Sequence, residues 1–183
     1  MAIAMLRAVN VAGHQKISME ALQTLCISLG LKDVKTYIQS GNIVFREHGK
    51  APEKLARTLE NGIEAKFGFR PAVLIRTAAE MRAVIANNPF AKRDEVQPNK
   101  LLVVFMSSAP TQKTIDQVLA LPCDPEEIHI LGREIYIYYP EGMARPKIPV
   151  ARLERILQCS STGRNWNTVN KLLAMAEALE EPH

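Results

Sequence analysis

Polar side chains with the chemistry to bind an anion lie close together near the start of the chain. Arg7, Asn10 and Lys16 fall between an apolar run and a predicted helix. Ser18 stands where an N-cap residue belongs, because its hydroxyl can accept a hydrogen bond from a free backbone N–H of the first turn. The positive end of a helix beside cationic side chains attracts negative charge. The segment therefore predicts an anion site, although any strand-to-helix connection needs small polar residues and a cap.

A second polar stretch separates two short apolar segments and contains Gln39, Ser40 and Asn42. Residues of these types dominate turns, so turn formation alone explains them, but Gln39 and Ser40 could also present donors to a ligand. We expect the side chains of Asn10, Gln39, Ser40 and Asn42 to lie close together. We expect the second strand to run antiparallel to the first, so that its end lies at the opposite edge of the sheet. Their proximity then requires residues 37–42 to be partly extended along the sheet, or the second unit to reach across.

A third polar stretch leads into the last predicted helix and holds Arg164, Asn165, Trp166 and Asn167. Arg164 could offer a forked donor to phosphate or carboxylate, and Trp166 a stacking surface. Alternatively, Asn167 or Thr168 caps the helix and Trp166 fixes it to the body of the protein. We expect a structural Trp166 and an Arg164 available to a ligand, because Arg164 follows Gly163 in what we predict to be the flexible part of a loop.

The elements that must position these side chains follow the order β-α-β-β-α-β in the first half of the chain. Apolar periodicity, Pro52 and the glycines after each helix give this order. The expected strands are 3–11, 34–38, 43–45 and 72–75, and the expected helices are 19–29 and 52–67. This is the split βαβ pattern of ferredoxin-like folds, with two helices on one face of an antiparallel sheet.

The second half predicts a related β-α-β-β-α unit with C-terminal helices. Its strands are expected at 101–106, 128–131 and 135–139, with helices after Pro110 and Pro149 and a final helix over 169–179. The charged segment 91–100 contains Pro98 and is expected to be a mobile surface connection. We therefore predict an α+β protein of two α/β units, residues 1–90 and 91–183.

The amino-acid composition and net charge exclude few classes of function. The 183 residues carry a net charge of +4 and a pI near 9.0, which permits an acidic partner without demanding one. Three widely spaced cysteines favour a reducing compartment over a disulfide scaffold. The histidines lack metal-ligand spacing, and no stretch resembles a signal peptide or a membrane span. We expect a cytoplasmic protein without a metal, cofactor or membrane partner.

Familiar catalytic motifs are missing from the sequence. It contains no G-x-x-x-x-G-K-[ST] phosphate loop, no G-x-G-x-x-G after a strand and no G-x-S-x-G elbow. No pair of carboxylates stands out for acid–base chemistry. A general base would have to be His14 or His129, and the strand position of His129 favours a structural role.

The three polar stretches resemble the signatures of a bacterial protein family of unknown function, DUF1697. The resemblance is carried by Leu6–Gly13, Tyr37–Phe45 and Arg164–Thr168, with lesser matches at Arg76-Thr77, Asn88-Pro89-Phe90 and Gly132-Arg133-Glu134. It implies two α/β parts with ferredoxin-like topology, but no activity or catalytic residue. The sequence has Ala8 and Ala12 where the family's loop usually has glycine, which would hinder a ligand that must approach the backbone closely.

Three functions remain open. The leading hypothesis is a binding module for an anionic ligand, either a phosphorylated small molecule or nucleic acid. RNA-recognition modules share the element order but stack bases on aromatic side chains of the central strands, where the first unit offers only Tyr37 and Phe45. The second hypothesis is an enzyme with its site between the two units, formed by Arg7, Asn10, Gln39, Asn42 and Arg164. The third is an oligomerisation or regulatory module that forms a homo-oligomer.

Overall fold

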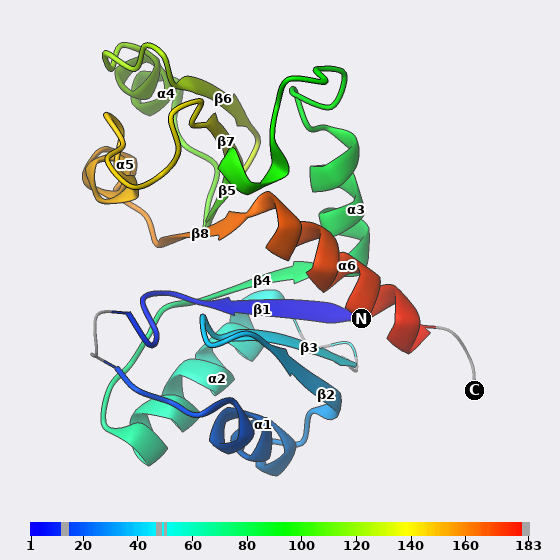
Figure 1. The fold of residues 1–183 in the computed structure, drawn as a ribbon. Helices are drawn as coiled ribbons and strands as arrows, with labels where there is room; N and C mark the ends of the chain where they lie inside the picture. Colours follow the sequence, from blue (N-terminus) through cyan, green and yellow to red (C-terminus); the bar gives the residue numbers. More distant parts are fainter. Residues whose placement is uncertain (12–14, 47–48, 50, 181–183) are drawn as a thin grey trace. The chain divides into compact units, whose positions relative to one another are not determined.

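The computed structural model describes residues 1–11, 15–46, 49 and 51–180, and Figure 1 shows the fold. The contacts between residues divide the chain into two compact units. One comprises the described residues of Met1–Ala83 and Lys171–His183, and the other comprises Val84–Asn170. The division falls inside helix α3 (Ala78–Ala86) and inside helix α6 (Trp166–Glu180), which differs from the expected 1–90 and 91–183. Which pieces fold independently remains a prediction.

The first unit has the expected β-α-β-β-α-β order. Its elements are β1 (Ala2–Leu6), α1 (Met19–Ser28), β2 (Lys32–Tyr37), β3 (Asn42–Arg46), α2 (Pro52–Phe67) and β4 (Val73–Thr77). The strands form one sheet in the order β2-β3-β1-β4, and all neighbouring strands are antiparallel. The ferredoxin-like prediction for this unit is confirmed.

Strand direction in this sheet differs from our expectation. Strands β1 and β2 are both antiparallel to β3, which lies between them, so β1 and β2 run in the same direction. Their carboxyl ends therefore lie at the same edge of the sheet, and the expected opposite placement was wrong. The cause is the connecting helix α1, which returns the chain to the starting edge before β2 begins.

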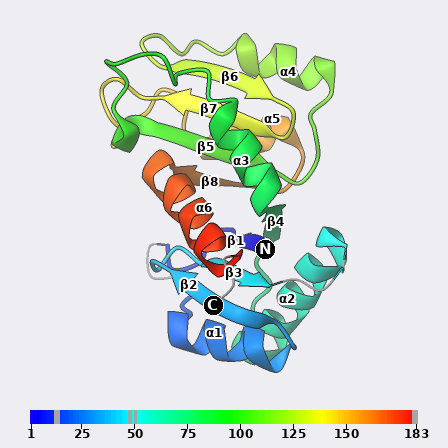
Figure 2. The ribbon, with the colours of Figure 1, turned by 90° about the vertical axis from the view of Figure 1, so that its right-hand side faces the viewer.

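Helices α1 and α2 pack together on one face of the first sheet, as Figures 1 and 2 show. Helix α2 carries Leu55, Leu59 and Ile63 at four-residue spacing, so they form one buried stripe. The helix ends at Gly68, whose φ of 78° is left-handed and whose N–H donates to Glu64 O. The stripe packs on inward-facing side chains of β1, β3 and β4, and this core fixes the sheet edge described below.

The second unit repeats the topology of the first. Its elements are a short 3₁₀ turn η1 (Pro98–Lys100), β5 (Leu101–Met106), α4 (Gln112–Leu119), β6 (Glu127–Leu131), β7 (Glu134–Tyr138), α5 (Val150–Leu157) and β8 (Ser161–Asn165). The strand order is β6-β7-β5-β8, again antiparallel throughout. A core of side chains from β5, β7, α4 and α5 fills the space between the helices and the sheet.

Strand β8 corrects our sequence-based prediction of a loop over 161–168. Its sequence, Ser-Thr-Gly-Arg-Asn, has no apolar alternation, but it pairs with the apolar strand β5 from Ser161 opposite Met106 to Asn165 opposite Leu102. The backbone hydrogen bonds of an edge strand do not depend on side-chain type, so polar residues can form one. With β8, the second unit completes the β-α-β-β-α-β order.

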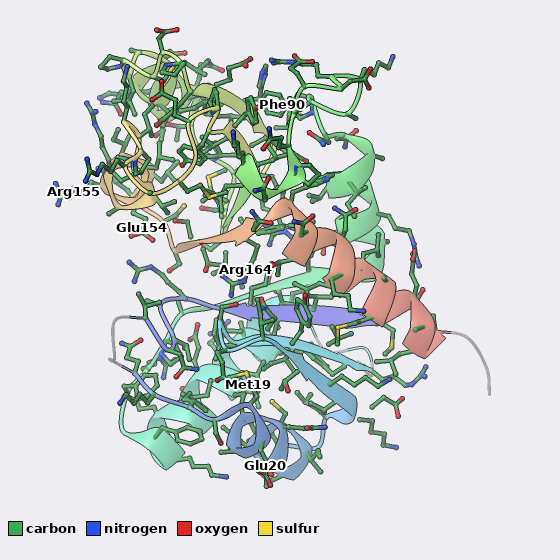
Figure 3. All side chains as sticks on the ribbon, viewed as in Figure 1. Met19, Glu20, Phe90, Glu154, Arg155 and Arg164 are labelled. Carbon is green, nitrogen blue, oxygen red and sulfur yellow. The ribbon has the colours of Figure 1, made fainter. Side chains whose placement is uncertain are left out.

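The segment before β5 contacts strand β6 of the second sheet. The ring of Phe90 is only 2% exposed and lies edge-on to His129, with the centroids 5.1 Å apart. Arg93 forms ion pairs of 2.7 Å with both Glu95 and Glu127. The ion pair with Glu127 joins the segment to the second sheet, and the mobility expected over 91–100 remains a prediction. Figure 3 labels Phe90.

Candidate functional site

Asn10 joins the loop after β1 to two other segments of the first unit. Its side-chain amide donates to Ile17 O (2.9 Å) and to Gln39 O (2.7 Å). Its side-chain oxygen accepts from Ile17 N (2.9 Å), and its backbone N–H donates to Gln15 O (3.2 Å). Both amide donors are therefore used within the protein. Asn10 positions the loop, the start of α1 and the β2–β3 turn relative to one another.

Asn42 has a similar role inside the β2–β3 turn. Its side chain is fully buried and donates to Tyr37 O (3.0 Å) and to Ser40 Oγ (2.9 Å). The expected proximity of Asn10, Gln39, Ser40 and Asn42 is thus confirmed, but the two asparagine amides hold backbone rather than face solvent. Among the expected binding residues of this unit, the exposed side chains are those of Arg7, Lys16 and Gln39.

The N-terminus of α1 lies beside these loops. Ser18 Oγ accepts from Ala21 N (3.1 Å), so the predicted cap is confirmed. Met19 and Glu20 form the first turn, and Figure 3 shows Glu20 on the outer side of the helix. The remaining N–H groups of this turn carry the partial positive charge of a helix N-terminus. We call this region the β1–α1 edge; its described charged side chains include the cations Arg7 and Lys16 and the anion Glu20.

Several residues of the β1–α1 edge have left-handed backbone conformations. The φ angles are 55° at Ala8, 57° at Asn10 and 50° at Gln15, and Ile38 in the β2–β3 turn has 47°. Such values are uncommon for residues other than glycine, and a β-branched residue such as Ile38 is an outlier. Ala8 is one of the two positions where the resemblance led us to expect glycine, and its positive φ gives the physical reason. Left-handed outliers of this kind cluster at functional sites.

Gly41 lets the β2–β3 turn approach β1 closely. Its φ is 72°, and a Cβ at this position would lie 2.9 Å from the Cβ of Leu6. The Leu6 N–H donates to Gly41 O at 2.9 Å, and the Arg7 N–H donates to Ala72 O at the same distance. The end of β1 is therefore held on both sides, which fixes the backbone from which Arg7 projects.

Arg164 lies in strand β8 of the second unit rather than in a flexible loop, which corrects our expectation. The side chain is 6% exposed and donates to Thr162 Oγ1 and to Gly163 O, both at 2.8 Å. Burial lowers the pKa of its guanidinium to about 10. These contacts describe an internal arginine, labelled in Figure 3.

The cap of helix α6 also differs from our expectation. The helix begins at Trp166, and the side-chain oxygen of Asn165 accepts from Asn167 N at 3.0 Å. Asn165 therefore acts as the cap, and the predicted caps Asn167 and Thr168 lie inside the helix. Asn165 also donates to Asn99 O (2.9 Å), whereas Asn167 is exposed and Trp166 is partly buried.

The expected binding residues thus fall into two groups. Arg7, Asn10, Lys16, Gln39, Ser40 and Asn42 gather at one edge of the first unit, and Arg164, Asn165, Trp166 and Asn167 belong to the second unit. A shared site for both groups remains a prediction. Of the two candidate bases, His14 lies outside the described residues, and the exposed His129 packs its ring against Phe90.

One buried arginine was not among the expected binding residues. Arg76 in β4 is 2% exposed and donates to Ile75 O at 3.0 Å. The signal in the sequence is a single charged residue inside the apolar run of a strand, a position that rarely carries a charge.

The three cysteines, Cys26, Cys123 and Cys159, are free. Burial raises the pKa of the Cys26 thiol to about 12. In the part of the chain that the structure describes, no cluster of three potential metal ligands is found. Within the same residues, no helix combines the length and the hydropathy needed to span a bilayer.

The fold and the β1–α1 edge define a two-unit α+β protein whose halves share the ferredoxin-like strand order. The model of a family described as proteins of unknown function (DUF1697) matches residues 1–136, and the chain belongs to this family. The matched range includes the β1–α1 edge and ends before β8, so the resemblance noted at Arg164–Thr168 lies outside it.

A solved structure described as a conserved bacterial protein from Streptococcus pneumoniae has the same fold. It is 23% identical to this chain, the TM-score is 0.74, and the match covers 96% of this chain and 97% of that one. No curated protein matches the sequence. The comparisons therefore establish family and fold.

Proposed function

We propose that the β1–α1 edge binds a small anionic molecule, with a phosphoryl group as its recognised part. The observation that carries the proposal is the hydrogen-bonding of Asn10, which holds three segments together while Arg7 and Lys16 remain exposed beside the capped start of α1. Each side chain then has a defined role. The guanidinium of Arg7 would form paired hydrogen bonds to phosphate oxygens, and Lys16 would add a point charge.

The backbone supports the same proposal. Ala8 and Asn10 have left-handed backbone conformations, and the side chain of Asn10 is hydrogen-bonded to the backbone of Ile17, so the loop after β1 lies beside the residues just before α1. Free N–H groups at a helix start attract a phosphate, and cationic side chains beside them strengthen that attraction. The exposed amide of Gln39, on the adjoining turn, could donate to a second polar group of the ligand.

A small ligand is favoured over nucleic acid by the aromatic side chains. Phe45 is fully buried in the core of the first unit. In the second unit, Tyr136 and Tyr138 lie on the central strand β7, but they are also buried, and the Tyr136 hydroxyl donates to Val84 O at 2.7 Å. These three rings are packed, and Tyr37 at the end of β2 is only partly exposed, whereas recognition of single-stranded RNA uses exposed rings that stack on bases.

The experiment is a titration of the full-length chain with inorganic phosphate, a sugar phosphate and a single-stranded RNA, followed by ¹H–¹⁵N NMR at constant ionic strength. We expect phosphate and the sugar phosphate to shift resonances of the β1–α1 loop and of the first turn of α1. Arg7→Gln should weaken binding by about tenfold, the value of one charge-assisted bond. Arg57→Gln, which removes the same charge from an exposed position on α2, should leave the affinity unchanged.

Two results would overturn the proposal. One is the absence of shifts at the β1–α1 edge with any phosphorylated probe. The other is an equal loss of affinity in Arg7→Gln and Arg57→Gln, which would indicate attraction by overall charge only. Tighter binding of RNA than of the sugar phosphate, with shifts at the same residues, would replace the small molecule by nucleic acid.

A further inference from the structure

The second unit contains a cavity of about 380 Å³ at the end of β5, apart from the site proposed above. Its walls come from the β5–α4 loop, the first turns of α4 and the turn that follows α5. The polar side chains that line it include those of Ser108, Thr111, Lys113, Gln117 and Gln158. The volume suits a molecule the size of a small metabolite, because such sites usually range from about 300 to 1,000 Å³.

The lining of this cavity favours negative charge. Among the described lining residues there is one ammonium group, on Lys113, with hydroxyls and amides and no carboxylate. Hydroxyl and amide groups can donate hydrogen bonds to an anion, and an acidic side chain would repel it. The cavity therefore combines several donors with a net positive charge.

The cavity occupies the same place in the second unit as the β1–α1 edge does in the first. The N–H groups of Met106 and Ser107 donate to Arg133 O and Ser160 O, both at 2.9 Å. These bonds correspond to those from Leu6 and Arg7 at the end of β1. In each unit, the chain therefore leaves the end of its first strand with the same two backbone hydrogen bonds.

A buried hydroxyl close in sequence to the lining of the cavity lacks a partner among the described residues. Ser161 is fully buried, and its Oγ makes no hydrogen bond within them. It pairs with Met106 across β5 and β8, so its side chain lies on the face of the sheet that carries α4 and α5. It follows Cys159, a lining residue, by two positions. A buried hydroxyl is normally satisfied by protein, water or ligand. Because Ser161 is not itself a lining residue, a partner on the cavity side would be a water between its hydroxyl and the cavity.

The geometry points to a second ligand site in this cavity, one that takes a small phosphorylated molecule. In this site Lys113 supplies the charge, and the hydroxyls of Ser108 and Thr111 and the amides of Gln117 and Gln158 supply hydrogen bonds. Ser161 gains its partner from a water bound with the ligand. The proposal does not depend on the β1–α1 edge, because the residues of the two sites are different.

The cysteines provide a direct test. Cys159 lines the cavity, whereas Cys123 is partly exposed in the same unit and does not line it. The full-length chain is alkylated with and without inorganic phosphate or a sugar phosphate at constant ionic strength, and modification of each cysteine is followed by peptide mass spectrometry. We expect the phosphorylated probes to slow the alkylation of Cys159 and to leave the rate at Cys123 unchanged.

Two variants test which side chains of the second site contribute to binding. Lys113→Gln should raise the ligand concentration needed for protection by about fivefold, the upper range for an exposed ion pair, whereas Lys92→Gln, at an exposed position outside the cavity, should not change it. Ser161→Ala should also weaken protection without lowering the melting temperature, because it removes an unsatisfied group. Two results would overturn the proposal. One is an alkylation rate at Cys159 that no phosphorylated probe changes. The other is an equal change in the protecting ligand concentration in Lys113→Gln and Lys92→Gln. Arg7→Gln should leave the protection of Cys159 intact, which separates this site from the first.

Discussion

Replacing Asn10 tests whether its side chain holds the β1–α1 edge together. The side chain makes three hydrogen bonds, two to Ile17 and one to Gln39 O, and the residue has a left-handed φ of 57°. Alanine removes all three bonds and keeps a Cβ in this strained conformation. Glycine removes the same bonds but accepts the conformation without strain. The pair of variants therefore separates the side-chain contribution from the backbone contribution.

The expected losses of stability depend on the backbone groups that lose their hydrogen-bond partner when Asn10 is replaced. A net hydrogen bond is worth about 1 kcal/mol, and the orphaned backbone groups at this partly exposed site regain some bonding to water. We expect Asn10→Gly to lower the free energy of unfolding by about 2 kcal/mol. Asn10→Ala should cost about 3 kcal/mol, because alanine in the left-handed region adds about 1 kcal/mol.

Urea unfolding followed by circular dichroism measures these changes as shifts of the midpoint at constant slope. Asn87→Ala is the control, since Asn87 is an exposed asparagine in a turn, and its loss should change stability by less than about 0.5 kcal/mol. If Asn10→Ala and Asn10→Gly were both as stable as this control, Asn10 would not organise the edge. The same variants should also lose the phosphate-induced NMR shifts of the β1–α1 loop, because the loop that follows Arg7 would no longer be hydrogen-bonded to Ile17, the residue after Lys16.

Three further changes are expected. Ala8→Gly should raise stability by about 1 kcal/mol in urea unfolding, because glycine relieves the left-handed φ of 55°; no gain would contradict the strain. The unfolded chain ionises Cys26 near pH 9, whereas the folded pKa is raised to about 12, so stability should fall as pH rises through that interval, and Cys26→Ala should flatten this slope in unfolding curves. Arg164→Ala should destabilise the protein at least as much as Trp166→Ala, by about 2–4 kcal/mol, because it empties a buried polar site; an Arg164→Ala variant as stable as the parent chain would contradict the structural role of this side chain.

The sequence predicts elements well where apolar spacing is regular. In α2, Leu55, Leu59 and Ile63 recur every four residues, and Pro52 and Gly68 delimit the helix, so its bounds follow from local chemistry alone. Strand β8 offers no such signal. Its five residues are polar or small, and they form a strand because the apolar strand β5 lies beside them. That pairing joins segments about sixty positions apart, and local patterns carry no information about it.

The sequence predicts which residues lie at the site more reliably than it predicts what each side chain does there. Asn10 and Asn42 are at the expected edge, but both amides donate to backbone carbonyls, so they shape the site instead of offering donors to a ligand. Arg164 was expected in solvent and is internal. The same side chain can bind a ligand or a neighbouring carbonyl, and its surroundings decide which. Those surroundings depend on the tertiary fold, so residue identity alone does not reveal them.

The edge itself, however, follows from the order of elements. In a split βαβ unit the connecting helix returns the chain to its starting edge, so the loop after the first strand and the turn after the second must meet there. This rule brings Asn10 to Gln39 O in the first unit, and in the second it brings Met106 N to Arg133 O. A repeated topology therefore creates the same kind of edge twice, while the side chains differ: Arg7 and Lys16 at one, Ser108 and Lys113 at the other. Since the backbone frame is shared and the side chains are not, the two sites should differ in the ligand they select more than in the charge they require.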